Sequence, residues 1–310
     1  MNLRAQPRQM KKPSRHSRSR KEKSDRPERN SSRGSNRSPA RPGRRDDRSE
    51  ERREGRSQNQ GPQRSNDRGN DRNNARRAPR LPREVSVLYE DDALIVLNKP
   101  AGLLAVPIKG SDVASALSLL IAELKPKRQR ALIVHRIDRF ASGILLFAKT
   151  NHDRDGLIQQ FLAHTPVRKY LAVVRGRINA EAATLVHYFR REGMYQQLRT
   201  ARDPEAARAE LRYIVERTFA DATLVRVELI TGLQNQIRAQ FFAMGHPLIG
   251  DRKYHRKEAD EPLIARVALH AAYLQFVHPR SGESIVIECP PPQDFQHLVQ
   301  QLSRPGRPRR

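Results

Sequence analysis

The 310-residue sequence has almost no cysteine and no long apolar run. Cys289 is the only cysteine, which excludes a disulfide framework and a cysteine-based zinc site and suits a reducing compartment. The apolar runs fall far short of the ~20 residues of a membrane helix. The N-terminus also lacks the apolar core of a secretory signal, ~7–15 residues long. We therefore expect no membrane association and no secretion through such a signal.

The first 80 residues lack almost every residue type that builds a core. Leu3 is their only leucine, and they contain no valine, isoleucine, phenylalanine, tyrosine or tryptophan. Such a segment cannot bury enough apolar surface to offset the entropy lost on ordering its backbone. The composition predicts a disordered basic tail at 1–80, a folded domain at 81–303 and a short basic tail at 304–310.

The positive charge is large and unevenly placed. The formal net charge is +26, of which residues 1–80 carry +16, with 26 Lys and Arg against 10 Asp and Glu. This excess predicts a polyanionic partner, and nucleic acid is the usual one. Because the tail has no aromatic side chain to stack on a base, we expect it to contact RNA phosphates weakly and without sequence preference.

The apolar pattern after residue 80 predicts an α+β domain. Strands outnumber helices and do not alternate with them one for one, which favours a mixed, largely antiparallel sheet with flanking helices. The helices are expected to begin at Asp112, Asn151, Asn235 and Asp294, with Gly245 ending the third. The strands are predicted at 85–89, 94–97, 131–134, 144–148, 170–174, 211–215, 223–230, 267–277 and 284–287.

No familiar cofactor motif is present. The sequence contains no phosphate-binding glycine loop, no H-E-x-x-H zinc motif and no G-x-S-x-G nucleophile elbow. It therefore predicts no cofactor and no metal site.

The loop at 135–143 is the most unusual segment, because Asp138 lies between Arg136 and Arg139 and between two apolar runs. A neighbouring guanidinium favours the ionised form of a carboxylate, which can then act as a nucleophile or a base. The alternative is a salt-bridged loop aspartate without a catalytic role. His135 could ligate a metal together with Asp138, or simply hydrogen-bond to the backbone.

The segment 231–238 places Arg238 in the first turn of the third predicted helix, where the helix dipole disfavours a cation. An arginine in this position is expected to be held by an acidic partner. The alternative is an ordinary exposed helix arginine. Asn235 is expected to cap the helix.

These two segments resemble a known family. Residues 135–150 read HRIDRFASGILLFAKT and resemble the signature of the RluA-type RNA pseudouridine synthases, H-R-L-D-x-x-T-S-G-L-L-L-x-A-K. Residues 229–254 resemble the family's later motif, T-G-R-x-H-Q-I-R followed by G-x-P-(I/L)-x-G-D-x-x-Y. Shorter matches to its opening strands, its K-x-Y-x-A segment, its C-terminal strand and its end lie at 87–107, 168–172, 266–279 and 290–295.

The resemblance implies a pseudouridine synthase fold with a central RNA-binding cleft, and a cofactor-free isomerase that converts specific uridines of structured RNA to pseudouridine. It implies that Asp138 is the catalytic nucleophile and base, that Tyr170 packs on the flipped uracil, and that Arg238 pairs with Asp138. Arg136 matches the residue that enters the gap left by the flipped nucleotide. The motif residues expected to contact RNA beside Arg136 are His135, Arg139, Asn235 and Gln236.

The sequence departs from the family pattern at Leu233, where an arginine is usual, and at Asn235, where a histidine is usual. These departures motivate a second hypothesis, a non-catalytic RNA-binding protein or RNA chaperone on the same fold. A third is a hydrolase that uses Asp138 with His135. The family implies a cytoplasmic bacterial monomer, and ribosomal and transfer RNA are both possible substrates.

Overall fold

A computed structural model describes residues 84–254 and 263–304. The tail predicted at 1–80 and residues 305–310 of the C-terminal tail lie outside the described residues. The helices are α1 (Ala116–Leu124), α2 (Asn151–Leu162), α3 (Gln236–Ala243) and α4 (Gln293–Ser303). The strands are β1 (Ser86–Glu90), β2 (Leu94–Lys99), β3 (Leu132–Ile133), β4 (Ser142–Ala148), β5 (Val167–Arg175), β6 (Ala182–Glu192), β7 (Tyr195–Arg199), β8 (Ala207–Thr218), β9 (Ala222–Leu229), β10 (Leu269–Val277) and β11 (Ser284–Glu288).

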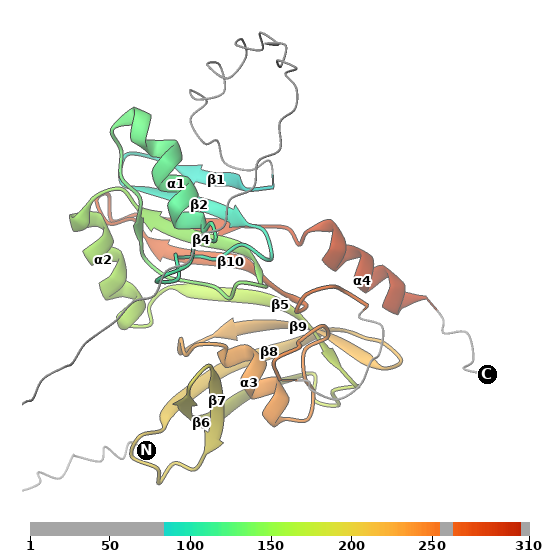
Figure 1. Ribbon diagram of the computed structural model, residues 1–310. Helices are drawn as coiled ribbons and strands as arrows, with labels where there is room; N and C mark the ends of the chain where they lie inside the picture. The colour runs from blue at the N-terminus through green and yellow to red at the C-terminus, as the bar shows by residue number, and fades with distance from the viewer. Residues whose placement is uncertain (1–83, 255–262, 305–310) are drawn as a thin grey trace, which may run out of the picture. The chain divides into compact units, whose positions relative to one another are not determined.

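The strands form one mixed sheet in the order β1-β2-β4-β10-β5-β9-β8-β6-β7, with β3 also paired to β4 and β11 to β10 (Figure 1). Every described pair is antiparallel except β4 with β10. The predicted α+β fold with a largely antiparallel sheet is therefore confirmed. No helix in the described part of the chain is long and apolar enough to cross a membrane.

Strand β4 lies in the middle of one half of the sheet, and all seven of its residues are buried. Gly143 near its start has φ +108°, and a Cβ added there would lie 2.2 Å from the carbonyl oxygen of Ala271 on β10. Only glycine permits this close approach of the two strands. Their pairing fixes the point at which the preceding loop, 134–141, enters the sheet.

Helices α1 and α2 pack on opposite faces of β2 and β4. Leu120 of α1 lies in one hydrophobic cluster with Leu97 of β2. Leu157 of α2 lies in a second hydrophobic cluster with Val96, which precedes Leu97 in β2 and faces the opposite side of the sheet. This arrangement follows from the alternation of side chains along a strand. The run Leu94–Leu97 is apolar at every position because a helix covers each face.

The N-caps predicted for these two helices are wrong, by three residues in α1 and by one in α2. Ser115, not Asp112, is the N-cap of α1, because Ser115 and Ser118 accept each other's backbone N–H groups in a capping box. Thr150, not Asn151, is the N-cap of α2, with its hydroxyl accepting from the N–H of Asp153 at 3.1 Å. In both helices a serine or threonine hydroxyl accepts the N–H group three residues later, in place of the Asp112 carboxylate and the Asn151 amide that we expected to do so.

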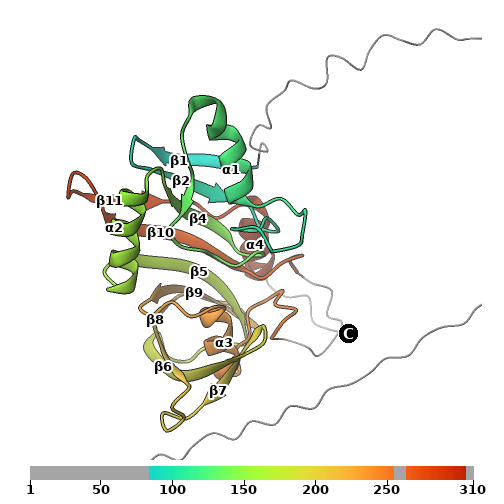
Figure 2. The same ribbon diagram turned by 60° about the vertical axis from the view of Figure 1, so that its left-hand side comes forward.

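The second half of the sheet curls around α3 (Figure 2). The side-chain amide of Gln240 on α3 donates to the carbonyl oxygens of Leu185 on β6 and Ala209 on β8, at 3.1 and 3.2 Å. The hairpin of β6 and β7 is absent from the sequence prediction, which has no strand between residues 174 and 211. Apart from the buried Phe189, the side chains of these two strands are exposed or half-buried, and they do not form a continuous buried run.

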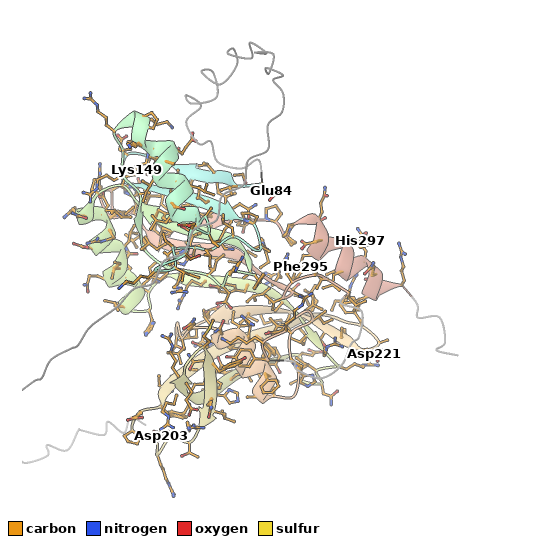
Figure 3. The ribbon with its side chains drawn as sticks, in the orientation of Figure 1. Glu84, Lys149, Asp203, Asp221, Phe295 and His297 are labelled. Carbon is orange, nitrogen blue, oxygen red and sulfur yellow. The ribbon has the colours of Figure 1, made fainter. Side chains whose placement is uncertain are left out.

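Helix α4 closes the chain against the face of β5 opposite α3. Phe295 and Leu298 are buried in a cluster with Val173 of β5, whereas His297 on the other side of the helix is exposed (Figure 3). The prediction of a last helix at 294–302 is confirmed to within one residue at each end.

Candidate active site

The loop at 134–141, between β3 and β4, is held in place by hydrogen bonds from a lysine side chain to its backbone carbonyls. Lys99 at the end of β2 is completely buried, and its Nζ donates to the carbonyl oxygens of Arg139 and Ala141 at 3.0 and 2.8 Å. The same Nζ donates to the carbonyls of Pro100 and Leu103. Burial lowers the pKa of Lys99 to about 7, and the nearby charge of Asp138 opposes that fall. One lysine thus joins the 100–103 turn to the loop that carries Asp138.

Asp138 on this loop is paired with Arg238 on α3, 100 residues later in the chain. Arg238 Nη1 donates to Asp138 Oδ2 at 3.1 Å. The other edge of the guanidinium binds Asp251 through two bonds, Nε to Oδ2 at 2.7 Å and Nη2 to Oδ1 at 2.6 Å. The side chains of Asp138, Arg238 and Asp251 are 21%, 9% and 0% exposed. Arg238 therefore has two acidic partners, Asp138 and Asp251, where the sequence predicted one.

The charge of Arg238 is secured by this geometry. Burial alone would lower the pKa of Arg238, but its hydrogen bonds to Asp251 and the charges of Asp251 and Asp138 outweigh burial and raise it. A two-bond contact also fixes the plane of the guanidinium, which a single bond does not. Asp251 therefore orients Arg238, and Arg238 presents one N–H group to Asp138.

Asp251 is itself held by the backbone. Its Oδ1 accepts from the N–H groups of Lys253 and Tyr254 at 2.9 and 3.2 Å. The preceding Gly250 has φ +72°, and a Cβ added there would lie 2.0 Å from the carbonyl oxygen of Arg266. The glycine of the G-D-x-x-Y segment therefore allows the close approach that places Asp251 under α3.

The N-terminus of α3 differs from the prediction. Asn235 occupies the N-cap position but has left-handed backbone geometry, φ 56°, and makes no side-chain cap. Its Oδ1 accepts from Arg238 Nη1 at 2.9 Å instead. Gln236 is buried, and its Oε1 accepts from the N–H of Leu233 at 2.9 Å while its amide donates to the carbonyl of Glu210 at 3.0 Å. Arg238 competes with the helix end for the Asn235 side chain, and Gln236 is fully used within the protein.

Asp138 and Arg238 line a cavity of about 500 Å³ between the loop, α2, β5 and the start of α3. Tyr170 of β5 lies in its wall and is 8% exposed. Burial raises the pKa of Tyr170, a rise that the charge of Arg168 opposes and that of Asp138 reinforces. The phenol is therefore neutral at neutral pH. The cavity brings together the three residues that the resemblance assigns to catalysis.

The other residues singled out by the sequence fall into different places. Arg136 is exposed and lines the cavity, whereas Arg139 is exposed outside the lining and donates from Nε to the carbonyl of Gly102 at 2.9 Å. His135 lines the cavity, and its Nε2 accepts from the N–H of Leu146 at 3.1 Å. Burial, with the charge of Arg168, lowers the pKa of His135 to about 3, so the ring is neutral. It stacks on Phe161, with ring centroids 4.9 Å apart.

Three residues of the site were missed at the level of sequence: Lys99, Asp251 and Arg168. Lys99 binds Arg139, 40 positions later, and Asp251 binds Arg238, 13 positions earlier. The only sequence signal for either residue is its place inside a segment that resembles the family. Arg168 lines the cavity beside Tyr170, and its only sequence signal is its place in the K-x-Y-x-A segment. Within the described ranges, no three His, Cys, Asp or Glu side chains gather as a metal ion would require.

Comparisons with known proteins agree with this geometry. Residues 93–243 match the family model described as RNA pseudouridylate synthase. The chain is 36% identical over 232 residues to the uncharacterized RNA pseudouridine synthase YlyB of Bacillus subtilis (strain 168), which covers 73% of this chain and 75% of the relative. It is 33% identical over 241 residues to ribosomal large subunit pseudouridine synthase D of Zymomonas mobilis, covering 73% of this chain and 76% of the relative.

A further relative is ribosomal large subunit pseudouridine synthase C of Escherichia coli (strain K12), 34% identical over 223 residues, with 70% of this chain and 69% of the relative covered. Among solved structures, human RNA pseudouridylate synthase domain containing 4 superposes with a TM-score of 0.58 at 21% identity, over 70% of this chain and 92% of that one. Human RNA pseudouridylate synthase domain containing 1 gives 0.55 at 22% identity, over 73% and 97%. These two structural likenesses concern the fold.

Proposed function

The chain belongs to the RluA-type RNA pseudouridine synthases, and from this membership we propose that it isomerises uridine in large-subunit ribosomal RNA with Asp138 as the catalytic carboxylate. Pseudouridine synthesis breaks the C1′–N1 bond of uridine and forms a C1′–C5 bond. A proton leaves C5 and one is taken up at N1, so the reaction has no net loss or gain of atoms. The substrate assignment is supported by the names of the relatives that act on the ribosomal large subunit. Transfer RNA is the alternative substrate.

The assignment of Asp138 is carried by one observation, its pairing with Arg238 at the wall of the cavity, where its side chain stays 21% exposed. Arg238 Nη1 donates to Oδ2 of the carboxylate at 3.1 Å and thereby orients it. Because Asp251 occupies two of the donors of Arg238, Asp138 receives a single bond and keeps acceptor sites free. An ionised, oriented and accessible carboxylate is what a nucleophile or a base requires.

Tyr170 and Arg136 receive distinct roles in this proposal. A uridine must leave the RNA stack before a carboxylate can reach it. The ring of Tyr170 in the cavity wall offers the extruded base an apolar surface for stacking. Arg136 is exposed at the cavity and can fill the gap left in the RNA, because its guanidinium both stacks and hydrogen-bonds.

The cations at the outer part of the cavity fit RNA phosphates. Arg208 lines the cavity with its side chain 50% exposed and pairs with Glu210. Arg136 is likewise exposed. Long basic side chains at a cavity mouth supply the salt-dependent part of RNA affinity. We assign Arg136 and Arg208 to substrate binding, and residues 1–80 to additional weak contacts with RNA through their charge.

The test is the conversion of ribosomal RNA from a strain that lacks the gene. The purified wild type should restore pseudouridines that chemical mapping finds missing in that RNA, and Asp138→Asn should restore none while keeping RNA affinity within about 3-fold. Asp92→Asn, a change of the same kind at an exposed aspartate between β1 and β2, is the matched control and should be fully active. Full turnover by Asp138→Asn would reject the catalytic assignment, and RNA binding without turnover by the wild type would favour the non-catalytic alternative.

A further inference from the structure

The described residues contain three deeply buried arginines, and one of them differs from the others. Arg168, Arg238 and Arg266 are 9%, 8% and 7% exposed. Arg238 is neutralised by Asp251 and Arg266 by Asp294, each through two hydrogen bonds. Arg168 has no carboxylate partner within the described part of the chain. Since burying an unpaired charge is costly, this exception calls for an explanation.

The guanidinium of Arg168 is satisfied on one side only. Its Nη2 donates to the carbonyl oxygens of Leu229, Ile230 and Thr231 at 3.1, 3.1 and 3.3 Å, where β9 ends. Its Nε is buried and has no hydrogen-bond partner, and no described residue accepts from Nη1. Nη1 lies against Gly232, where an added Cβ would be 3.1 Å away. Donors of a buried cation are therefore left free.

Because Nε is buried, Nη1 is the donor that a molecule in the active-site cavity would meet. Arg168 and Gly232 both line it, together with Tyr170 and Asp138. Arg168 and Tyr170 are two residues apart on β5, so their side chains point to the same face of the sheet. The guanidinium also lies over the ring of Phe161, 5.7 Å from its centroid. The cation is thus fixed by three carbonyls and one aromatic ring beside the tyrosine proposed to stack on the base.

We propose that Arg168 is a further catalytic residue, which donates hydrogen bonds to a carbonyl oxygen of the flipped uracil and stabilises the negative charge that builds up on the base. This inference rests on the proposed function. When the C1′–N1 bond breaks, its electron pair passes to N1 and is shared with the carbonyl oxygens of the ring. The pair then forms the C1′–C5 bond, a proton leaves C5 and N1 gains one. If Asp138 instead adds to the base first, the displaced electrons also move toward a carbonyl oxygen.

A uracil carbonyl fits this position better than a phosphate does. The flipped base enters the cavity, whereas the phosphates stay with the strand outside, where the exposed Arg136 and Arg208 can meet them. Arg168 lies in a buried wall, where a charge acts through a lower dielectric than it does in water. A cation without a protein counter-ion is also free to respond fully to charge that appears only during the reaction. Burial lowers the pKa of Arg168, but arginine stays protonated in proteins.

Arg168→Gln removes the charge and keeps an amide donor for the backbone carbonyls. With in vitro transcripts of large-subunit ribosomal RNA, its kcat should fall about 100-fold, the typical effect of losing one oxyanion donor, while KM stays within about 3-fold. Arg168→Lys should recover part of the loss, since it restores the charge without the planar fork. Arg266→Gln is the control for a buried arginine that does not itself line the cavity and donates to the backbone carbonyls of Val267 and Leu269.

The decisive comparison uses the same transcript made with 5-fluorouridine. Fluorine at C5 withdraws electrons and stabilises the anionic base without help from the protein. Because a fluorinated C5 has no proton to release, the quantity compared on the two RNAs is the single-turnover rate at which the parent nucleoside disappears, followed by chromatography and mass spectrometry of digested RNA. The loss of this rate in Arg168→Gln should be at least 5-fold smaller on the fluorinated RNA. Arg266→Gln should lower the melting temperature and alter conversion of the two RNAs by the same factor.

Three outcomes would overturn the inference. An equal loss on both RNAs means that Arg168 only supports the 229–231 backbone. A rise in KM with unchanged kcat and a shallower salt dependence of RNA affinity means that it binds a phosphate. Full activity of Arg168→Gln means that it has no role. Absence of pseudouridine with the wild type would instead reject the proposed function itself, so the two failures are distinguishable.

Discussion

Replacing Asp251 by asparagine tests whether a residue that never touches the substrate sets the geometry of the active site. Asp251 is completely buried and accepts four hydrogen bonds, two from Arg238 and two from the backbone. The asparagine keeps the size of the side chain but removes the charge and one acceptor oxygen. Arg238 is then left buried with Asp138 as its only carboxylate among the described residues.

The expected loss of stability follows from the cost of breaking a buried ion pair, about 3 kcal/mol or more when one partner is removed. For a domain of this size, 1 kcal/mol corresponds to roughly 2–4 °C, so the melting temperature should fall by about 6–12 °C. The guanidinium also loses the two bonds that fix its plane. Because a displacement of about 1 Å at a reacting group can cost 100-fold in rate, kcat should fall by one to two orders of magnitude.

Calorimetry and single-turnover kinetics on ribosomal RNA measure the two effects separately. Asp294→Asn is the matched control, because Asp294 binds Arg266 through the same two-bond contact but its side chain is 48% exposed. It leaves Arg266 buried without a carboxylate and should also lower the melting temperature, but it should leave kcat unchanged because Arg266 does not line the cavity. The double variant Arg238→Met with Asp251→Leu should regain stability relative to Asp251→Asn and stay inactive, since apolar groups can replace a buried pair.

Two results would refute this reasoning. If Asp251→Asn melts with the wild type, the buried pair does not stabilise the fold as its geometry indicates. If it melts early but turns over at the wild-type rate, Arg238 does not need Asp251 to present its N–H group to Asp138.

Three further predictions follow from the charges of the molecule. Arg238→Ala should lower kcat, because Asp138 loses the N–H group that orients it, and an unchanged kcat would contradict a role for the Asp138 ion pair. Burial lowers the pKa of Lys99 from 10.5 to about 7, so the unfolded chain binds more protons between these values. The free energy of unfolding should therefore rise with pH above 7, by up to about 1.4 kcal/mol per unit, and denaturant titrations of Lys99→Met should lose that slope. Deleting residues 1–80 should weaken RNA binding mainly at low salt, and loss of all activity at saturating RNA would show a specific role for the tail.

The parts of the fold that could be predicted from sequence are those that an apolar run defines locally. Strand β4 was predicted within two residues because five consecutive apolar residues, 144–148, suit a strand buried on both faces. The β6–β7 hairpin was missed because its side chains alternate between solvent and a shallow contact with α3. Arg190 and Gln197 in it are as polar as loop residues, and their strand character arises from pairing with each other across the hairpin.

The site shows the same division. The cation in the first turn of α3 predicted an acidic partner, because the helix dipole alone makes that position unfavourable for Arg238. Nothing local to Arg238 distinguishes Asp138, 100 residues earlier, from Asp251, 13 residues later. The resemblance supplied Asp138. Asp251 could be identified as the second partner only from the structure, in which the left-handed turn at Gly250 places it under the helix. Such contacts depend on how distant segments pack, which no pattern of neighbouring residues records.

The three buried arginines show how the same side chain can do different work in one fold. Asp294 neutralises Arg266, which does not line the cavity, donates to backbone carbonyls and has a structural role. Arg238 is neutralised by Asp251 and donates from Nη1 to Asp138, so it orients a carboxylate without adding net charge to the site. Arg168 has carbonyls but no carboxylate among its described neighbours, so its full charge remains inside the cavity. A reaction that places negative charge on a buried base needs an uncompensated cation of this kind, and of the three only Arg168 can supply it.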